Sequence, residues 1–246
     1  MGRVLAWGLL AAGIVVSTFI AAKAWKEVKT RTVRTIEVTG AAKRRITSDL
    51  IEWSARVTAR GDDQAGAYRQ LKDQVEKVLA YLKQQGVTDK ELRPSAVTIE
   101  PVMETITTGT GETRTQKVVQ HGFQTWQEIT VQSHQVDKVE RVSREVTTLL
   151  EAGVAVTSQP PAYYYTKLGE IKVQMLAEAA KDARMRAEQI LHSAGSAALG
   201  KLRKGDMGII NVNPPNSTAT SWEGNNDTSS LEKDMITVVH CEFDVN

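Results

Sequence analysis

The chain contains a single cysteine, Cys241, among its 246 residues. One cysteine excludes an internal disulfide framework and any Cys-x-x-Cys metal site. Cys241 lies in the alternating run ITVVHCEFDV, and no base motif accompanies it. We therefore interpret it as a packed strand residue and not as a reactive thiol.

The chain also has no strong excess of charge of either sign. Its 31 Lys and Arg residues nearly balance its 29 Asp and Glu residues, for a net charge of +2. A nucleic-acid-binding domain usually carries a clear basic excess, so we expect no nucleic-acid partner. With 24% charged and 41% hydrophobic residues, the composition is that of an ordinary globular protein, long enough to bury a proper core.

Local signatures of catalysis and of cofactor binding are missing. There is no Gly-x-Ser-x-Gly elbow, and Gly109-Thr110-Gly111 is not followed by the Gly-Lys-Ser/Thr of a phosphate loop. The four histidines fall in four different predicted elements without HxH or HExxH spacing: His121, His134, His192 and His240. We therefore predict no catalytic, cofactor-binding or metal-binding residue, no cofactor, and a protein that is not an enzyme.

One long hydrophobic run stands out at the N-terminus. Residues 4–22 contain no charge and are bounded by Arg3 and Lys23. A helix of this length spans about 28 Å, close to the ~30 Å of a membrane hydrocarbon core. Residues 1–24 are thus a membrane anchor that contacts lipid through residues 4–22, or a signal segment cleaved near Ala22-Lys23-Ala24. The length favours the anchor.

Residues 25–34 follow as a basic tether. By the positive-inside rule, this tether would place the body of the protein in the cytoplasm.

Residues 35–246 are predicted to form one α+β domain. Strands are expected at 35–40, 49–60, 95–102, 117–133, 154–166, 208–212 and 235–245, and helices at 63–86, 135–150 and 169–195. The clearest strand buries one face through Ile51, Trp53, Ala55, Val57 and Ala59. Residues 49–102 and 117–166 form two similar strand–helix–strand blocks. We expect antiparallel sheets with helices packed on one face.

The longest predicted helix, 169–195, has an apolar face made mostly of alanine. We place on this face Leu176, Ala180, Ala183, Ala187, Ile190 and Ala194. Small side chains predict that a sheet approaches the helix closely. The charged side, which includes Arg184 and Arg186, is predicted to face solvent or another subunit.

Two polar segments are predicted to be loops: 104–116, as a flexible hairpin connection between strands, and 213–232. Trp222 stands alone among small polar residues in the second loop. Long loops in compact domains are commonly functional, so we predict Trp222, together with Arg184 and Arg186, as a contact for an oligomer or another partner. The alternative is a tryptophan tucked locally against its own loop.

Scattered framework residues carry a resemblance to a known family. They are Ile36-Glu37-Val38-Thr39-Gly40, Leu82, Gly86-Val87, Pro101, His121-Gly122-Phe123, Asp137-Lys138-Val139, Leu149, Ala152-Gly153, Ala177–Arg186, Ala187, Gly195 and Leu199-Gly200-Lys201. In these residues the chain resembles the SIMPL domain family, which includes bacterial periplasmic immunogenic proteins and oxidative stress defence proteins.

The resemblance implies a SIMPL-like α+β domain outside the cytoplasmic membrane, with no established catalytic residues to carry over. Some relatives assemble into large homo-oligomeric rings, and some are linked to oxidative stress resistance. We therefore expect a single-pass protein of the bacterial inner membrane, its body in the periplasm, acting as a non-enzymatic assembly or scaffold unit. A cleaved periplasmic or secreted form and a cytoplasm-facing form are the alternatives for location. The alternative function is a small-molecule or peptide-binding module, or an unrecognised hydrolase, that uses loops 104–116 and 213–232.

Overall fold

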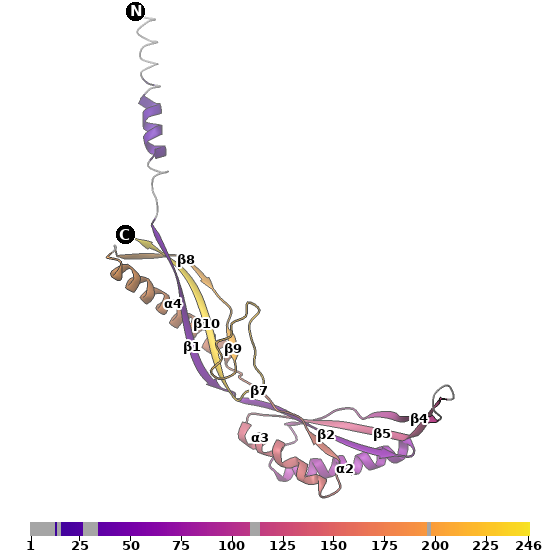
Figure 1. Ribbon diagram of the computed structural model, residues 1–246. Coiled ribbons are helices and arrows are strands. Elements are labelled where there is room, and N and C mark those ends of the chain that lie inside the picture. The colour runs from indigo at the N-terminus through magenta and orange to yellow at the C-terminus, as the bar shows by residue number, and fades with distance from the viewer. Residues whose placement is uncertain (1–12, 14–15, 27–33, 109–113, 196–197) are drawn as a thin grey trace, which may run out of the picture. The chain divides into compact units, whose positions relative to one another are not determined.

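A computed structural model of the chain describes residues 13, 16–26, 34–108, 114–195 and 198–246 (Figure 1). Residues 13 and 16–26 are helical, and Phe19 and Trp25 are exposed there. Within the described residues, no helix combines the length and the hydrophobicity that crossing a membrane requires. Residues 4–12, 14 and 15 of the predicted membrane segment, and 27–33 of the predicted tether, lie outside the described residues.

Contacts between residues divide the chain into two compact units. The terminal unit comprises Met1–Ala42, Leu176–Gly208 and Val238–Asn246, and the central unit comprises Lys43–Met175 and Ile209–Thr237. The division falls inside three elements, β1 (Thr35–Thr47), α4 (Leu168–Ser193) and β10 (Glu232–Val245), which supply residues to both units.

The central unit is built on a six-stranded antiparallel sheet. Strand β2 (Leu50–Gly61) pairs with β5 (Thr115–Ser133) from Ile51↔Ser133 to Gly61↔Phe123. The other edge of β5 carries β3 (Leu92–Pro94) and β4 (Thr98–Thr108), and the other edge of β2 carries β6 (Val156–Ser158) and β7 (Ala162–Tyr164).

Two helices complete the central unit, α2 (Gln64–Gln84) and α3 (Val136–Glu145), the latter followed by the 3₁₀ helix η2 (Val146–Leu150). The order β2-α2-β3, β5-α3-β6 and the sheet order β3-β5-β2-β6 are those of a split β-α-β arrangement. The two strand–helix–strand blocks expected from the sequence thus interleave in one sheet.

One face of this sheet is buried by α2 and α3 (Figure 1). The alternation predicted for β2 is confirmed, because its five apolar side chains are all buried. They form one core with the helix residues Leu71, Val75, Val78, Leu82, Val136, Val139 and Val142. Burying each such aliphatic side chain contributes about 1.5–3 kcal/mol, so this core is the main source of the unit's stability.

Local signals at the ends of α2 also behave as the sequence predicts. The side chain of Asp63 caps the helix, its Oδ1 accepting a hydrogen bond from the Gly66 amide at 2.6 Å. Gly86, just beyond the helix, has a φ of 81°, which suits glycine. The cap and the glycine therefore set where the helix begins and ends.

The terminal unit contains the pairing of β10 with β8 (Leu199–Met207), and β1 lies on the other side of β10 in the same sheet. The antiparallel register places His240 opposite Asp206, and it shifts after Glu242. Cys241 is 6% exposed within β10, so its interpretation as a packed strand residue is confirmed. Near its start, in the central unit, β10 pairs with β9 (Asn211–Asn213).

Helix α4 packs closely on its sheet, as its alanines predict, but the buried row differs from the predicted one. The fully or nearly buried side chains recur every four residues: Met175, Ala179, Ala183, Ala187 and Leu191. Ala180, Ile190 and Ala194 are exposed, so their assignment to the buried face was wrong. A strict spacing of four winds slowly around a helix of 3.6 residues per turn, which yields an oblique row of contacts.

Gly40 of β1 explains how closely the helix approaches the strand. A Cβ atom added at Gly40 would lie 2.1 Å from the Ala179 carbonyl oxygen and 2.7 Å from the Ala183 Cβ. Only a glycine facing a row of alanines leaves room for this contact.

Candidate interaction site

The segment between β9 and β10, residues 214–231, folds around two buried asparagines. Asn211 Oδ1 accepts hydrogen bonds from the amides of Ser221 (3.0 Å) and Asn225 (2.9 Å). Asn213 donates through Nδ2 to the Ala219 carbonyl at 2.7 Å and accepts from Asn225 Nδ2 at 2.9 Å. This polar loop is therefore held by side-chain amides in place of an apolar core.

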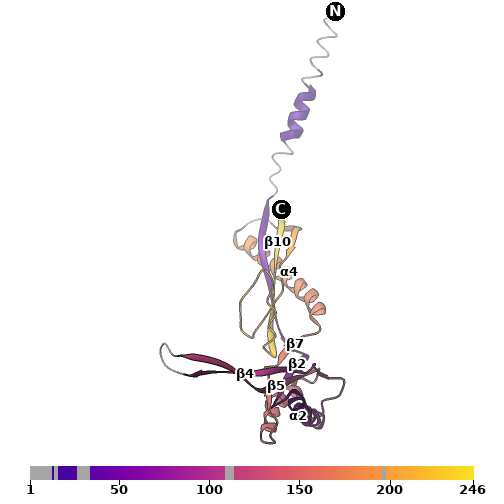
Figure 2. The ribbon, with the colours of Figure 1, turned by 90° about the vertical axis from the view of Figure 1, so that its right-hand side faces the viewer.

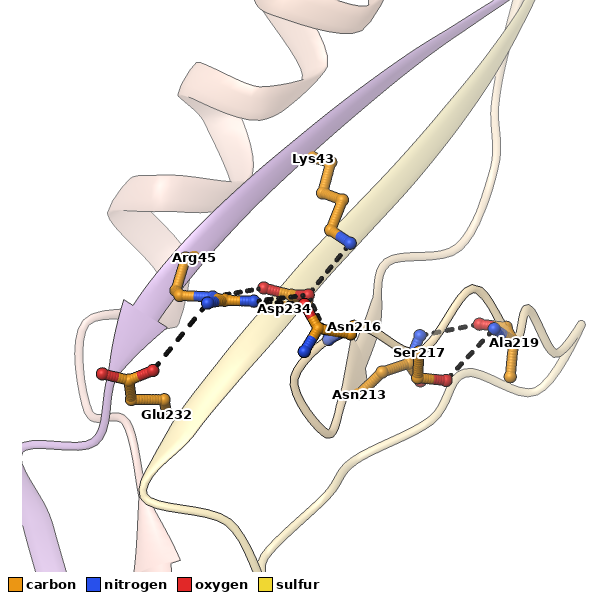
Figure 3. A network of polar contacts seen from close by, with 8 residues as sticks. All are labelled: Lys43, Arg45, Asn213, Asn216, Ser217, Ala219, Glu232 and Asp234. Carbon is orange, nitrogen blue, oxygen red and sulfur yellow. Dashed lines mark hydrogen bonds and ion pairs between the residues drawn. The ribbon is translucent and has the colours of Figure 1, made fainter.

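Asp234 fastens the first part of the loop to β1 and β10 (Figure 3). Its side chain is 1% exposed and accepts hydrogen bonds from Arg45 Nε (2.9 Å) and from the Asn216 amide (2.7 Å), and Lys43 Nζ lies 2.9 Å away. These hydrogen bonds, that of Arg45 foremost, hold the pKa of Asp234 well below its usual range. The carboxylate thus stays charged where the loop, β1 and β10 meet.

A second buried pair holds the end of the loop. Lys233 is 2% exposed and donates from Nζ to the Asp227 backbone carbonyl, with Asp227 Oδ2 at 3.9 Å. Burial lowers the pKa of Lys233. The other carboxylate oxygen of Asp227 accepts from the Ser229 amide and hydroxyl at 2.9 and 2.7 Å.

Trp222 projects into solvent from this hydrogen-bonded loop. It is 91% exposed, so the alternative of a locally tucked tryptophan is wrong. The turn that carries it is closed by a hydrogen bond from the Gly224 amide to the Ser221 carbonyl (3.3 Å), and Gly224 has a φ of 85°. The Glu223 amide donates to Ser221 Oγ at 3.2 Å. A large aromatic ring therefore projects from a turn that many hydrogen bonds define.

Arg184 and Arg186 make local ion pairs on α4. Arg184 Nε lies 2.9 Å from Glu188 Oε1, and Arg186 Nε lies 2.8 Å from Asp182 Oδ2. Asp182 also accepts a hydrogen bond from the Ala41 amide at 2.9 Å, which lowers its pKa. Both arginines belong to the terminal unit, whereas Trp222 belongs to the central unit. Because Arg186 pairs with Asp182, which accepts the hydrogen bond from β1, it also supports the attachment of α4 to β1.

Three of the four histidines have a polar partner in the structure. His121 Nε2 lies 2.9 Å from Glu104 Oε2, His134 Nδ1 lies 2.7 Å from the Asp49 carbonyl, and His240 Nδ1 lies 3.0 Å from Thr39 Oγ1. In the described part of the chain, no three His, Cys, Asp or Glu side chains are grouped so that they could hold a metal ion.

The predicted loop 104–116 is mostly part of a β-hairpin arm. Strands β4 and β5 pair as far as Thr108↔Thr115, and residues 109–113 lie outside the described part. Figure 2 shows this arm extending past α2 within the central unit. Met103 and Val118 are 59% and 62% exposed on it. Because Thr105 pairs with Val118, Met103 and Val118 share one face of the arm.

These observations define an α+β protein of antiparallel sheets and packed helices, with a structured polar loop that presents an exposed tryptophan. The family model SIMPL, described as a protein of unknown function (DUF541), matches residues 36–238. The chain belongs to the SIMPL family. A comparison with curated proteins gave no match.

Proposed function

We propose that this SIMPL protein is a membrane-anchored, periplasm-facing unit of a homo-oligomeric assembly, a ring or a larger structure. In this role it acts as a scaffold without catalysis of its own, in defence of the cell envelope or against oxidative stress. The family resemblance supports the setting, and the 19 uncharged residues at 4–22 support the anchor.

The observation that carries the assembly proposal is Trp222. An exposed aromatic ring loses little conformational entropy when it is buried in an interface, and it brings about 150–250 Å² of largely apolar surface. Residues of this kind are enriched among interface hot spots, whose truncation costs about 2 kcal/mol or more. The hydrogen bonds of Asn211 and Ser221 preorganise the turn, which lowers the cost of binding further.

The β4–β5 arm supports the same proposal. Outside its pairing with β5, β4 has no other strand partner among the described residues, so its second edge is open. An open edge with exposed apolar residues such as Met103 and Val118 is a common place for another chain to attach. In this proposal the arm and Trp222 both contact neighbouring copies.

The size of the native particle extracted in mild detergent tests the proposal. We expect a defined homo-oligomer by mass photometry and by light scattering. Trp222→Ala should weaken it by about tenfold or more in the dissociation constant, because a tenfold change corresponds to 1.4 kcal/mol and a hot spot exceeds this value.

Tyr68→Ala is the matched control, because Tyr68 is an aromatic residue 45% exposed on α2. It should leave the particle size unchanged. A wild-type protein that is monomeric at every concentration in this experiment would refute the assembly proposal.

A cavity favours a second candidate function, a small-molecule or peptide-binding module. About 470 Å³ of space opens in the central unit, and Leu231 from the 213–232 loop forms part of its wall. None of the described residues of loop 104–116 lines it. The hydrolase form of this alternative gains no such support from the residues around the cavity, so we propose only the binding module.

A further inference from the structure

The cavity lies where the β1–β2 connection meets the start of α3. Ser48 and Asp49 line it from the connection, and His134, Lys138 and Arg141 line it from the segment that begins α3. All of these residues belong to the central unit. The cavity is therefore a feature of one compact unit.

The first turn of α3 offers free hydrogen-bond donors to this cavity. Gln135 is the N-cap residue, but its side chain makes no cap hydrogen bond. The amides at the first helical positions, beginning with Val136, therefore lack the partner that a cap would supply. The helix dipole adds partial positive charge at the same place, and such a helix end attracts anions.

Ser48 provides a second and independent sign of a ligand. The residue is 4% exposed, and its Oγ is buried without a hydrogen-bond partner among the described residues. Its backbone amide is satisfied, because it donates to the Leu231 carbonyl at 2.9 Å. A buried hydroxyl without a partner is unfavourable, and because Ser48 is part of the cavity wall, a ligand oxygen that reached its Oγ would relieve this cost.

The charges around the cavity indicate what kind of anion fits. Lys138 Nζ donates to the Gly86 carbonyl at 2.6 Å, which uses one of its three N–H donors. Arg141 makes no ion pair within the described part of the chain, which leaves its guanidinium available. Its planar donors suit the two oxygens of a carboxylate.

Two carboxylates in the wall limit the negative charge that the cavity can accept. Asp137 and Asp49 offset Lys138 and Arg141. The Asp49 carboxylate already has partners, because it accepts hydrogen bonds from the amide (2.7 Å) and the hydroxyl (2.8 Å) of Thr166. This balance favours a singly charged carboxylate over a doubly charged phosphate.

We propose that this cavity binds a carboxylate, either that of a small organic acid or that of a peptide C-terminus. Arg141 pairs with the charge, the amides of the first turn of α3 donate to the carboxylate oxygens, and the Ser48 hydroxyl supplies one more hydrogen bond. The proposal rests on the second candidate function and is independent of the assembly.

Ligand-observed saturation-transfer NMR on the full-length protein in detergent tests the proposal. The observed probes are N-acetylglycine, its neutral amide and propionate, and inorganic phosphate, which has no carbon-bound proton, is scored by its displacement of N-acetylglycine. We expect saturable binding of N-acetylglycine and at least tenfold weaker binding of the neutral amide. Arg141→Gln should weaken N-acetylglycine binding about tenfold. Arg144→Gln, on the same helix but outside the cavity wall, should not change it.

Ser48→Ala separates ligand binding from a structural role. Because the hydroxyl has no partner in the free protein, its removal should leave the melting temperature unchanged or raise it, while N-acetylglycine binds more weakly. A fall in melting temperature with unchanged binding would overturn the assignment of Ser48.

The probes also distinguish the possible failures. Equal affinity for propionate and N-acetylglycine supports a small acid, and stronger binding of N-acetylglycine supports a peptide end. Equal binding of the neutral amide, or stronger binding of phosphate, overturns the carboxylate proposal while the binding module stands. Failure of every probe to bind saturably overturns the proposal and its parent function together.

Discussion

The side chain of Asp234 makes the contacts that join the polar loop to the strands beside it. Its carboxylate meets Lys43, Arg45 and the Asn216 amide, yet only 1% of the side chain is exposed. Its charged partners come from a strand 189 residues away in sequence, counted from Arg45. The charge is favourable only while all three partners stay in place, so the loop and both strands are coupled through it.

Acid should weaken this connection. The folded-state pKa of Asp234 is depressed, so its contribution to stability is complete above the unfolded-state pKa of about 3.9 and is lost as the pH falls through the folded-state value. Asp234→Asn should lower the free energy of unfolding at pH 7 by about 1–3 kcal/mol, because charged hydrogen bonds are lost. It should also flatten the dependence of stability on pH below about 4.

Urea unfolding from pH 2 to 7 measures both effects. Asp206→Asn is a matched control, because Asp206 is an exposed aspartate on β8. If Asp206→Asn changed stability as much as Asp234→Asn at pH 7, the special role of Asp234 would be disproved.

The buried charged residues that hold the polar loop could not be predicted from the sequence. Trp222 could be singled out as a candidate contact because a lone tryptophan in a polar loop stands out locally. Lys233 and Asp234 looked like the ordinary polar start of a strand, although both are buried. Their burial depends on Asp227, Lys43 and Arg45, and nothing in the local pattern identifies these partners. The best available signal was the pair Asn211 and Asn213, two amides that flank a valine next to a long loop.

At the scale of elements, amphipathic patterns predicted the central unit well and α4 less well. In β2, apolar and polar residues alternate, so only one face can be buried, and that face is the observed one. In α4, alanines lie on several sides of the helix, and hydrophobicity does not distinguish the row of Ala179 from the row of Ala180. Gly40, on a strand distant in sequence, decides between the two rows. Because it has no side chain, the row that contains Ala179 and Ala183 can approach β1 closely.

Overpacking tests the observed row of α4. Ala183→Leu should lower the free energy of unfolding by about 1–3 kcal/mol, because Ala183 is fully buried where the helix approaches Gly40. Ala180→Leu, three residues earlier and exposed, should change it by less than about 0.5 kcal/mol. Thermal and urea unfolding of the two variants make the comparison. The reverse order of effects would restore the row first predicted from sequence.

The chain divides into two compact units at positions that no feature of the sequence indicates. Residues 35–246 were predicted as one domain, and that prediction stays open beside the division into two compact units. Domain boundaries are usually recognised by linkers rich in proline, glycine or polar residues. Here the division falls inside β1, α4 and β10, whose patterns continue without interruption. The SIMPL match at 36–238 includes residues of both units.

The location of the whole protein is the last prediction. We expect the full-length chain to sediment with the inner membrane, to resist alkaline carbonate and to be released by detergent, because residues 4–22 are long enough to span the hydrocarbon core. Deletion of residues 4–22 should move the protein to the soluble fraction. As a control, replacing Lys23, Lys26 and Lys29 with Gln should leave the protein in the membrane fraction, because the apolar run is intact.

Reporter fusions at Asn246 then decide between the two opposing signals on orientation. The family setting predicts active alkaline phosphatase, which requires the periplasm, whereas the basic residues after the apolar run predict an active cytoplasmic reporter. Positive charges bias orientation, but long following domains can be translocated regardless of them, so we expect the phosphatase to be active. An inactive phosphatase with an active cytoplasmic reporter would reverse the orientation. A soluble mature protein that lacks residues 1–24 by mass spectrometry would instead establish a cleaved signal segment.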